Sequence, residues 1–149
     1  MRVTVATPED IPELCELLAI LFSQEAEFAP DPVRQAEGVK AILADPSAGL
    51  ILVLKEEGAM IGMVNLLFTI STFLGSPVAL LEDMIIRPAH RGKGGGTLLL
   101  QAAMQNAAER GCRRITLLTD GSNAQAREFY EKMGFVESTM VPYRLILPE

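Results

Sequence analysis

The sequence predicts an α/β (α+β) fold in which four helices flank a mixed, mostly antiparallel central sheet. Three observations lead to this prediction. Two helix start signals lie within the first 32 residues, three extended segments follow one another in the middle of the chain, and residues 78–119 read as strand, helix and strand. Because a strand–helix–strand unit forms a right-handed parallel crossover, whereas strands joined by short turns are antiparallel, the sheet must be mixed.

The first half of the chain carries the helix start signals and the extended segments. After a short strand at residues 2–6, Thr7-Pro8-Glu9-Asp10 supplies an N-cap, a proline at the first helical position and two acids, which predicts a helix to about Phe22. Asp31-Pro32 repeats this signal for a second helix that ends near Ala44. Three extended segments are then predicted: 50–55, 60–71 and 78–86.

The second half alternates helices and strands. A third helix is predicted over Thr97–Arg110, followed by a strand at 114–119, and Gly111 lies between them as a left-handed C-terminal residue. Asn123 caps a fourth helix that runs to Met133. Two short strands are predicted last: 136–140 and 143–147. The expected order is β-α-α-β-β-β-α-β-α-β-β, within one domain over residues 1–149.

Composition and charge exclude several function classes. The net charge of -6 argues against nonspecific nucleic-acid binding. The sequence contains no secretory signal pattern and no apolar run near the roughly 18 residues that a membrane span needs, so we expect a soluble protein without a membrane partner. Two distant cysteines favour reduced thiols in the cytoplasm. A single histidine and the absence of a metal-binding motif predict that no metal is bound.

The third helix begins with the residue type that disfavours helices most. Four glycines lie within residues 92–96, and each glycine in a first turn gives up roughly 1 kcal/mol of helix propensity relative to alanine. No Ser, Asp or Asn occupies the cap position, and Arg87, Arg91 and Lys93 are not offset by any acid nearby. Free N–H groups, a helix dipole and cations together predict a phosphate site. A flexible solvent loop is the alternative interpretation.

Two segments resemble a known family. Residues 81–96, LEDMIIRPAHRGKGGG, resemble the signature of the GNAT superfamily of acyl-CoA-dependent N-acyltransferases, and Arg91, Gly94 and Gly96 match its core [Gln/Arg]-x-x-Gly-x-[Gly/Ala] motif. Residues 123–135, NAQAREFYEKMGF, resemble the family's second block. Spacings typical of a nucleotide P-loop or a dinucleotide fold are not met. The predicted element order agrees with the family fold.

The resemblance implies acetyl-CoA as the cosubstrate. Pantetheine would pair with the main chain of the strand before the glycines, and the diphosphate would bind at the glycines and Arg91. The implied cosubstrate-binding residues are Met84, Ile85, Ile86, Arg91, Gly92, Lys93, Gly94, Gly95, Gly96, Thr97 and Asn123. The family usually places an aliphatic residue where this chain has Gly95, which predicts a more flexible loop.

Glu82 and Tyr130 are the candidate catalytic residues. Glu82 occupies the position that resembles the general base of diamine-type relatives, although neighbouring Asp83 or a water molecule remains an alternative. Successive strand residues face opposite sides, so at most one of the two acids reaches a given cleft unless a bulge intervenes. Tyr130 lies where the family places the acid that protonates the departing thiolate. The alternatives are a structural ion pair for Glu82 and core packing for Tyr130.

The sequence therefore predicts an N-acetyltransferase that acts on a primary amine. Residues 23–31, in the region that walls the acceptor site in the family, are acidic with one aromatic, which favours a small cationic acceptor. The resemblance also implies a homodimer. Alternative functions are a noncatalytic acyl-CoA sensor or interaction module, a protein acetyltransferase acting on lysine or an N-terminus, and a nucleotide hydrolase.

Overall fold

The computed structural model describes residues 1–24 and 29–149. The chain forms two compact units, Met1–Leu118 and Thr119–Glu149. Part of the acidic segment that is predicted to line the acceptor site, residues 25–28, lies outside the described residues.

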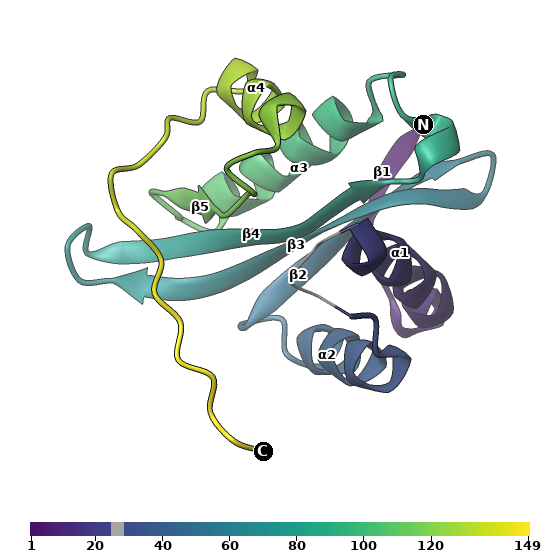
Figure 1. Ribbon diagram of the computed structural model, residues 1–149, viewed down its shortest axis with the longest axis horizontal. Helices are drawn as coiled ribbons and strands as arrows, with labels where there is room; N and C mark the ends of the chain where they lie inside the picture. Colours follow the sequence, from purple (N-terminus) through teal and green to yellow (C-terminus); the bar gives the residue numbers. More distant parts are fainter. Residues whose placement is uncertain (25–28) are drawn as a thin grey trace. The chain divides into compact units, whose positions relative to one another are not determined.

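A five-stranded sheet forms the centre of the first unit, with the strand order β1-β2-β3-β4-β5 (Figure 1). The strands are β1 (Arg2–Val5), β2 (Gly49–Glu56), β3 (Ala59–Ser71), β4 (Ser76–Ile86) and β5 (Ile115–Leu117). The first four strands are antiparallel to their neighbours, whereas β4 and β5 are parallel. The predicted mixed, mostly antiparallel sheet is confirmed.

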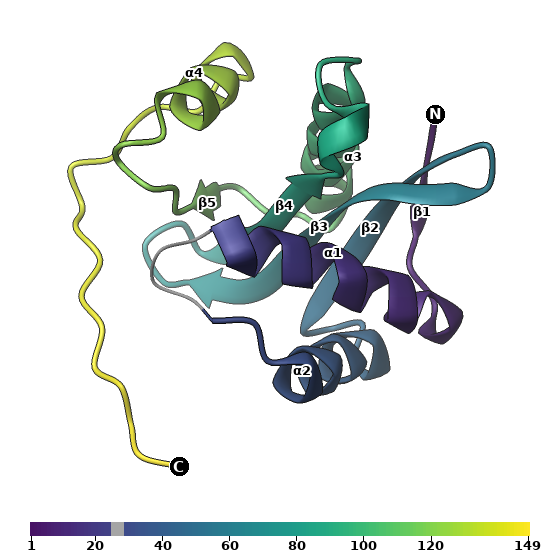
Figure 2. The ribbon, with the colours of Figure 1, turned by 45° about the vertical axis from the view of Figure 1, so that its right-hand side comes forward.

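Helices cover both faces of this sheet. The helices of the first unit are α1 (Ile11–Gln24), α2 (Pro32–Ala44) and α3 (Gly95–Glu109). Helices α1 and α2 lie on one side of the sheet and α3 lies on the other, as Figure 2 shows. Buried side chains on alternate positions of the central strands fill the space under α1 and α2, among them Ile51, Val53 and Met63. A core of this kind fixes which strand residues face the two helices.

The chain enters α1 through a short 3-10 turn, η1 (Pro8–Asp10), rather than directly into an α-helix. The Thr7 amide donates to the Asp10 carboxylate at 2.8 Å, and the Asp10 amide donates to the Thr7 carbonyl at 2.9 Å. Lys55 of β2 forms an ion pair with Asp10 at 3.2 Å. Thr7 and Asp10 therefore cap the helix start as predicted, and the ion pair with Lys55 links this start to β2.

The second unit contains α4 (Ala124–Lys132), and its predicted strands at 136–140 and 143–147 are wrong. Residues 133–149 are all described and include no strand, and from Val136 onward the large apolar side chains are exposed, from 71% at Val141 to 95% at Tyr143. Their alternation fits a strand pattern. However, a two-stranded hairpin is only marginally stable unless it packs on a third strand or a helix. The observed element order is β-α-α-β-β-β-α-β-α, with 3-10 turns at η1 and at η2 (Pro88–His90).

Residues 1–24 and 29–149 lack two features. They contain no helix that is long and apolar enough to cross a membrane. They also contain no group of three or more His, Cys, Asp or Glu side chains that is placed to hold a metal ion. The absence of a bound metal stays a prediction.

Candidate active site

A β-bulge interrupts β4 opposite the middle of β3. Met63 pairs with Ile85 and Asn65 pairs with Glu82, so that Asp83 and Met84 together oppose one residue of β3. Asp83 has φ 54°, a left-handed conformation that is uncommon for residues other than glycine. One extra residue in a strand bends it and frees a peptide group from the ladder.

The bulge brings two acidic side chains to one face of the sheet. Directly paired residues on antiparallel strands share a face, so Glu82 lies on the face of Asn65. The Asp83 carboxylate accepts a hydrogen bond from the side-chain amide of Asn65 and therefore lies on that face as well. The bulge that the sequence analysis named as the condition for this arrangement is present, and of the two acids Asp83 lines the pocket described below. Asp83 is partly buried and Glu82 is exposed.

The Asp83 carboxyl group has an unusual affinity for its proton. Burial and, to a lesser extent, the negative charge of Glu82 raise its pKa, the hydrogen bond from Asn65 lowers it, and the net result is a pKa of about 6. A carboxylate in a desolvated place beside a second acid holds its proton to higher pH. At neutral pH most of the group is ionised, and it readily exchanges a proton.

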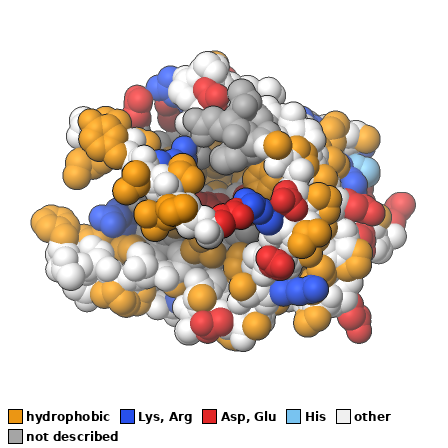
Figure 3. Space-filling view, turned by 60° about the horizontal axis from the view of Figure 1, so that its bottom comes forward, with side chains coloured by type: hydrophobic (Ala, Val, Ile, Leu, Met, Phe, Trp, Pro, Cys, Tyr) orange, Lys and Arg blue, Asp and Glu red, His pale blue; other side chains and the backbone are white. Residues whose placement is uncertain are grey.

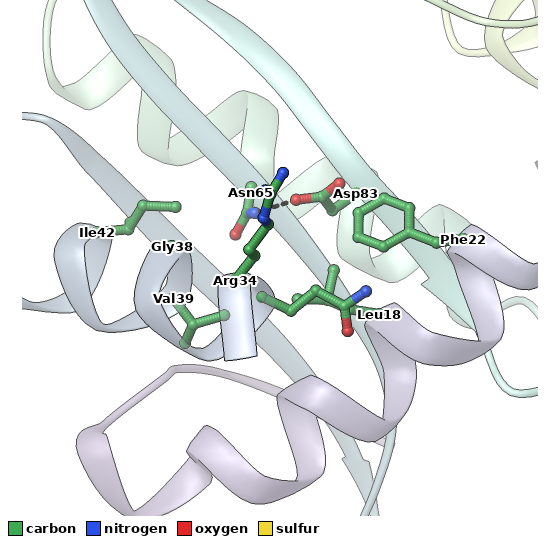
Figure 4. Close-up of a pocket in the computed structure, with 9 residues that line it drawn as sticks. Leu18, Phe22, Arg34, Gly38, Val39, Ile42, Asn65 and Asp83 are labelled. Carbon is green, nitrogen blue, oxygen red and sulfur yellow. Dashed lines mark hydrogen bonds between the residues drawn. The ribbon is translucent and has the colours of Figure 1, made fainter. Parts of the chain in front are cut away.

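A pocket of about 250 Å³ lies where α1, α2, β3 and β4 meet (Figure 4). Its apolar wall consists of Leu18, Phe22, Val39 and Ile42, together with the backbone of Gly38. Asn65, Asp83 and Gln35 supply the polar groups inside it. In Figure 4 the amide of Asn65 and the carboxylate of Asp83 point toward each other from adjacent strands. The pocket thus combines an apolar wall with a small polar patch.

Charges of both signs lie around the pocket. Arg34 of α2 lies at its edge and forms an ion pair with Asp31 at 3.4 Å. On the face drawn in Figure 3, acidic and basic side chains lie next to one another among hydrophobic ones. The described charges around the pocket are therefore of both signs, and the prediction of an acidic acceptor wall at residues 23–31 stays a prediction, because residues 25–28 lie outside the described residues.

The other side of β4 offers an open main-chain edge. Strand β5 pairs with β4 only from Ala79 to Leu81, whereas β4 continues to Ile86. The Arg87 amide donates to Ile61 of β3 at 2.7 Å, so the alternation of antiparallel strands directs the peptide groups of Ile86 away from β3. Ile85 pairs with β3, and Met84 belongs to the bulge, where the regular alternation is interrupted. Beyond Leu81 this stretch of β4 has no strand partner on the β5 side among the described residues, so its main chain can pair with an extended ligand.

The glycine segment forms an uncapped helix start beside this edge. Gly92 has φ 78° and Gly94 has φ 84°, and a Cβ atom added at either position would meet no atom within 4 Å. Helix α3 begins at Gly95, two residues earlier than predicted, and its N-cap Gly94 provides no side-chain hydrogen bond. The first turn of a helix leaves its N–H groups without partners in the helix. These groups, with the partial positive charge of the helix end, suit a phosphate.

Two basic side chains accompany this helix start. Arg91 and Lys93 are exposed. The Arg91 guanidinium donates to the Ile86 carbonyl at 2.9 Å, which anchors the loop to the end of β4. Thr97 completes the first turn of α3. The anion site predicted from the glycines and these cations therefore fits the observed backbone.

Gly95 has a packing role that the sequence did not reveal. It is buried in the first turn of α3, and an added Cβ atom would lie 2.8 Å from Cδ2 of the buried Leu54 on β2. Gly95 therefore lets α3 approach the sheet closely. Gly95 belongs to the first turn of α3, and not to the more flexible loop that the sequence predicts.

The second unit carries the other predicted site residues. The Asn123 side chain accepts a hydrogen bond from the Ala126 amide at 3.1 Å and caps α4, as predicted. The ring of Tyr130 contacts Phe129 and Phe135, with ring centroids 5.3 and 5.8 Å away. Burial raises the pKa of the Tyr130 hydroxyl, which is therefore protonated at neutral pH. Its role in catalysis stays a prediction.

Two polar residues of the pocket were missed in the sequence. Asn65 is 3% exposed, and it is the one polar side chain between Met60 and Phe68, a signal that could have identified it. Gln35 carries no comparable signal, because glutamine is common on the surfaces of helices. Neither residue would be placed beside Asp83 without knowledge of the strand register.

Comparisons with known proteins identify the family. Residues 11–135 match the model of the family described as the acetyltransferase (GNAT) family. The chain is 36% identical over 138 residues to the uncharacterized N-acetyltransferase YhfO of Bacillus subtilis, covering 88% of this chain and 90% of the relative. It is 27% identical over 135 residues to an aminoalkylphosphonate N-acetyltransferase of Salmonella typhimurium, covering 89% and 83%.

Solved structures agree at the level of the fold. A putative acetyltransferase from Agrobacterium tumefaciens superimposes with a TM-score of 0.83 at 27% identity, covering 99% of this chain and 100% of that one.

Proposed function

The chain belongs to the acetyltransferase (GNAT) family, and from that premise we propose that it transfers an acetyl group from acetyl-CoA to the primary amine of a small acceptor, by direct attack within a ternary complex. It is an acyl-CoA-dependent acetyltransferase. One observation carries the proposal. Strand β4 has a carboxylate-lined pocket at its bulge and an open main-chain edge that leads to an uncapped helix start.

The proposed cosubstrate site follows from that edge. The diphosphate of acetyl-CoA accepts hydrogen bonds from N–H groups between Arg91 and Thr97, and Lys93 adds positive charge. The pantetheine arm pairs with the main chain of Met84 and Ile86, as an added strand pairs with a sheet edge. Asn123 caps α4 and, in this proposal, also contacts pantetheine.

The proposed chemistry begins with an acceptor ammonium. Glu82, directly or through a water molecule, removes one proton to give the free amine. The amine nitrogen attacks the thioester carbon, a C–N bond forms, and the C–S bond breaks with its electron pair leaving on sulfur. The thiolate takes up a proton and the nitrogen loses its second one. The products are the N-acetyl amide, the CoA thiol and one proton released to water.

Two groups assist the breakdown of the tetrahedral intermediate in this proposal. A main-chain N–H near Met84, where the bulge frees a peptide group, stabilises the oxyanion. The Tyr130 hydroxyl donates a proton or a hydrogen bond to the departing thiolate. The hydroxyl carries its proton at neutral pH, as this role requires, although burial raises its pKa and makes it a weaker acid.

The remaining parts of the proposal concern the whole chain. Relatives are named as N-acetyltransferases of aminoalkylphosphonates and of aminoglycosides, which supports a small amine as the acceptor. The family match runs from residue 11 to 135 and so crosses both compact units, which supports one domain over 1–149. A cytoplasmic location and a homodimer complete the proposal.

A thiol-release assay tests this function. The purified protein is incubated with acetyl-CoA and a panel of primary amines, and both the free thiol and the N-acetyl product are measured. We expect stoichiometric amounts of both, and a large loss of turnover in Glu82→Gln and Tyr130→Phe. Binding of acetyl-CoA without turnover on any amine would favour a noncatalytic sensor, whereas turnover only on peptides would favour a protein acetyltransferase.

A further inference from the structure

The pocket under α1 and α2 contains a hydrogen-bond acceptor that no described residue satisfies. Asn65 is 3% exposed, and its Nδ2 donates to the Asp83 carboxylate. That hydrogen bond fixes the orientation of the amide, because only the nitrogen end can donate to a carboxylate. The other end, Oδ1, is buried and has no hydrogen-bond partner among the described residues. Buried polar atoms in native proteins are almost always paired, so this atom indicates a missing donor.

Further acceptors line the same pocket. The Asp83 carboxylate has remaining acceptor capacity, and Oε1 of Gln35 is also buried without a partner among the described residues. A primary ammonium group carries three N–H donors and no acceptor. It therefore satisfies a site made of acceptors better than a hydroxyl, which brings one donor, or a carboxylate, which brings none.

The rest of the pocket limits the body of the ligand. Its wall is made largely by aliphatic side chains and one aromatic ring. The volume of about 250 Å³ lies below the roughly 300–1,000 Å³ that is typical of pockets for drug-sized ligands. Among the described residues that line the pocket, Asp83 is the only acid, and the cationic Arg34 lies at the pocket edge, so a second cationic group on the ligand would gain little there.

We propose that this pocket binds the acceptor as a compact primary amine with an apolar body, whose ammonium donates hydrogen bonds to the Asp83 carboxylate and to Oδ1 of Asn65. The inference rests on the proposed function and narrows its acceptor from small cations in general to compact monoamines. Asn65 acts by binding the amine and by orienting Asp83. The proton is still removed by the proposed base, Glu82.

Steady-state kinetics with matched amines provides the test. The probes are isoamylamine, 1,4-diaminobutane and an aminoglycoside, each assayed with saturating acetyl-CoA. We expect kcat/KM for isoamylamine to exceed that for either of the others by about 10-fold or more, the factor that corresponds to one lost polar contact. A preference for the diamine or the aminoglycoside would overturn the inference while leaving the proposed function intact.

Variants separate binding from structure. In Asn65→Leu we expect KM for isoamylamine to rise about 10-fold, with KM for acetyl-CoA unchanged. The control is Asn106→Leu. Asn106 lies on α3, on the opposite face of the sheet from the pocket, and its Nδ2 donates to the Ala102 carbonyl. This control should leave both constants unchanged. Should Asn65→Leu not fold, Gln35→Met provides the same comparison with a smaller expected rise of about threefold. An unchanged KM for the amine in the folded variant overturns the inference.

A binding measurement separates failure of the pocket inference from failure of the proposed acetyltransferase function. Isoamylamine is titrated into the CoA-bound protein, and the side-chain amide signals of Asn65 are followed by NMR. A saturable shift without any turnover would support the pocket inference and contradict the proposed function. No shift at a concentration that supports turnover would overturn the pocket inference alone.

Discussion

Asp83 combines a left-handed backbone with a partly buried carboxylate beside a second acid. Each property is unfavourable for folding, and no cation among the causes of its pKa shift compensates the charge. Strained backbone and perturbed carboxylates gather at functional sites, where the surrounding structure holds them in place. We therefore expect stability and function to oppose each other at this residue.

The first prediction concerns stability. The folded state holds the Asp83 proton up to a pKa of about 6, against an ordinary value of 3.8, so the free energy of unfolding falls as pH rises between these values and stays lower above them. Asp83→Asn removes this penalty. We expect it to raise the free energy of unfolding by roughly 2 kcal/mol at pH 7.5 and by much less at pH 4, as measured by urea unfolding.

The matched control is Glu37→Gln, which removes an exposed charge from α2. It should change stability by no more than about 0.5 kcal/mol at either pH. If the Asp83→Asn variant shows no higher free energy of unfolding than the wild type at pH 7.5, burial does not destabilise the Asp83 carboxylate as described.

The second prediction concerns the pH dependence of activity. The ionised carboxylate of Asp83 binds the ammonium group, so kcat/KM for the amine should rise with pH through an apparent pKa near 6. Because Glu82 and Asp83 interact, this value belongs to the pair of acids. This rise of kcat/KM near pH 6 should disappear in the Asp83→Asn variant. A rate profile that is flat between pH 5 and 7 in the wild type would contradict the assignment.

At the scale of elements, a glycine lets the first turn of α3 lie close to the sheet, on which the helix also buries apolar side chains such as Leu99 and Leu100. Gly95 and Gly38 are both helical glycines, but their surroundings differ. A Cβ atom at Gly95 would meet Leu54 at 2.8 Å, whereas at Gly38 of α2 nothing lies within 4 Å. The same substitution should therefore have opposite effects in the two helices.

The third prediction follows from this contrast. Gly38→Ala should stabilise the protein by about 0.5–1 kcal/mol, because alanine favours the helix and meets no obstacle. Gly95→Ala should destabilise it by about 1 kcal/mol, because overpacking against a fully buried leucine exceeds the gain in helix propensity. Thermal unfolding of both variants provides the measurement. A stabilised Gly95→Ala would show that α3 does not pack closely on β2.

The elements themselves could be predicted well because their signals are local. Caps such as Asp31 and Asn123 and the left-handed Gly111 all act within a few residues of the chain. The bulge at Asp83 and its contact with Asn65 could not, because they depend on how two distant strands pair. The last two strands were predicted from alternation alone, which indicates a strand only where a partner exists.

At the scale of the whole molecule, the C-terminal segment exposes more apolar surface than a soluble chain usually does. Its exposed large apolar residues are Val136, Met140, Val141, Tyr143, Leu145, Ile146 and Leu147. Contiguous exposed patches of this kind often mark an interaction surface. In the proposed homodimer, a second copy of the chain would cover these side chains.

The fourth prediction tests this association. We expect sedimentation equilibrium to give a dimer at micromolar concentration, and the double variant Leu145→Lys with Leu147→Lys to be monomeric, because two buried cations would oppose the interface. The control is Glu149→Gln in the same segment. A monomeric wild-type chain would contradict the proposed dimer.

The central claim is that main-chain N–H groups between Arg91 and Thr97 bind the diphosphate of the cosubstrate. Amide NMR signals of Gly92, Gly94, Gly96 and Thr97 test it most directly, in parallel titrations with acetyl-CoA and with S-acetylpantetheine, which lacks the diphosphate. The account predicts large saturable shifts of these signals with acetyl-CoA and none with S-acetylpantetheine. Unshifted signals in the presence of bound acetyl-CoA would contradict it.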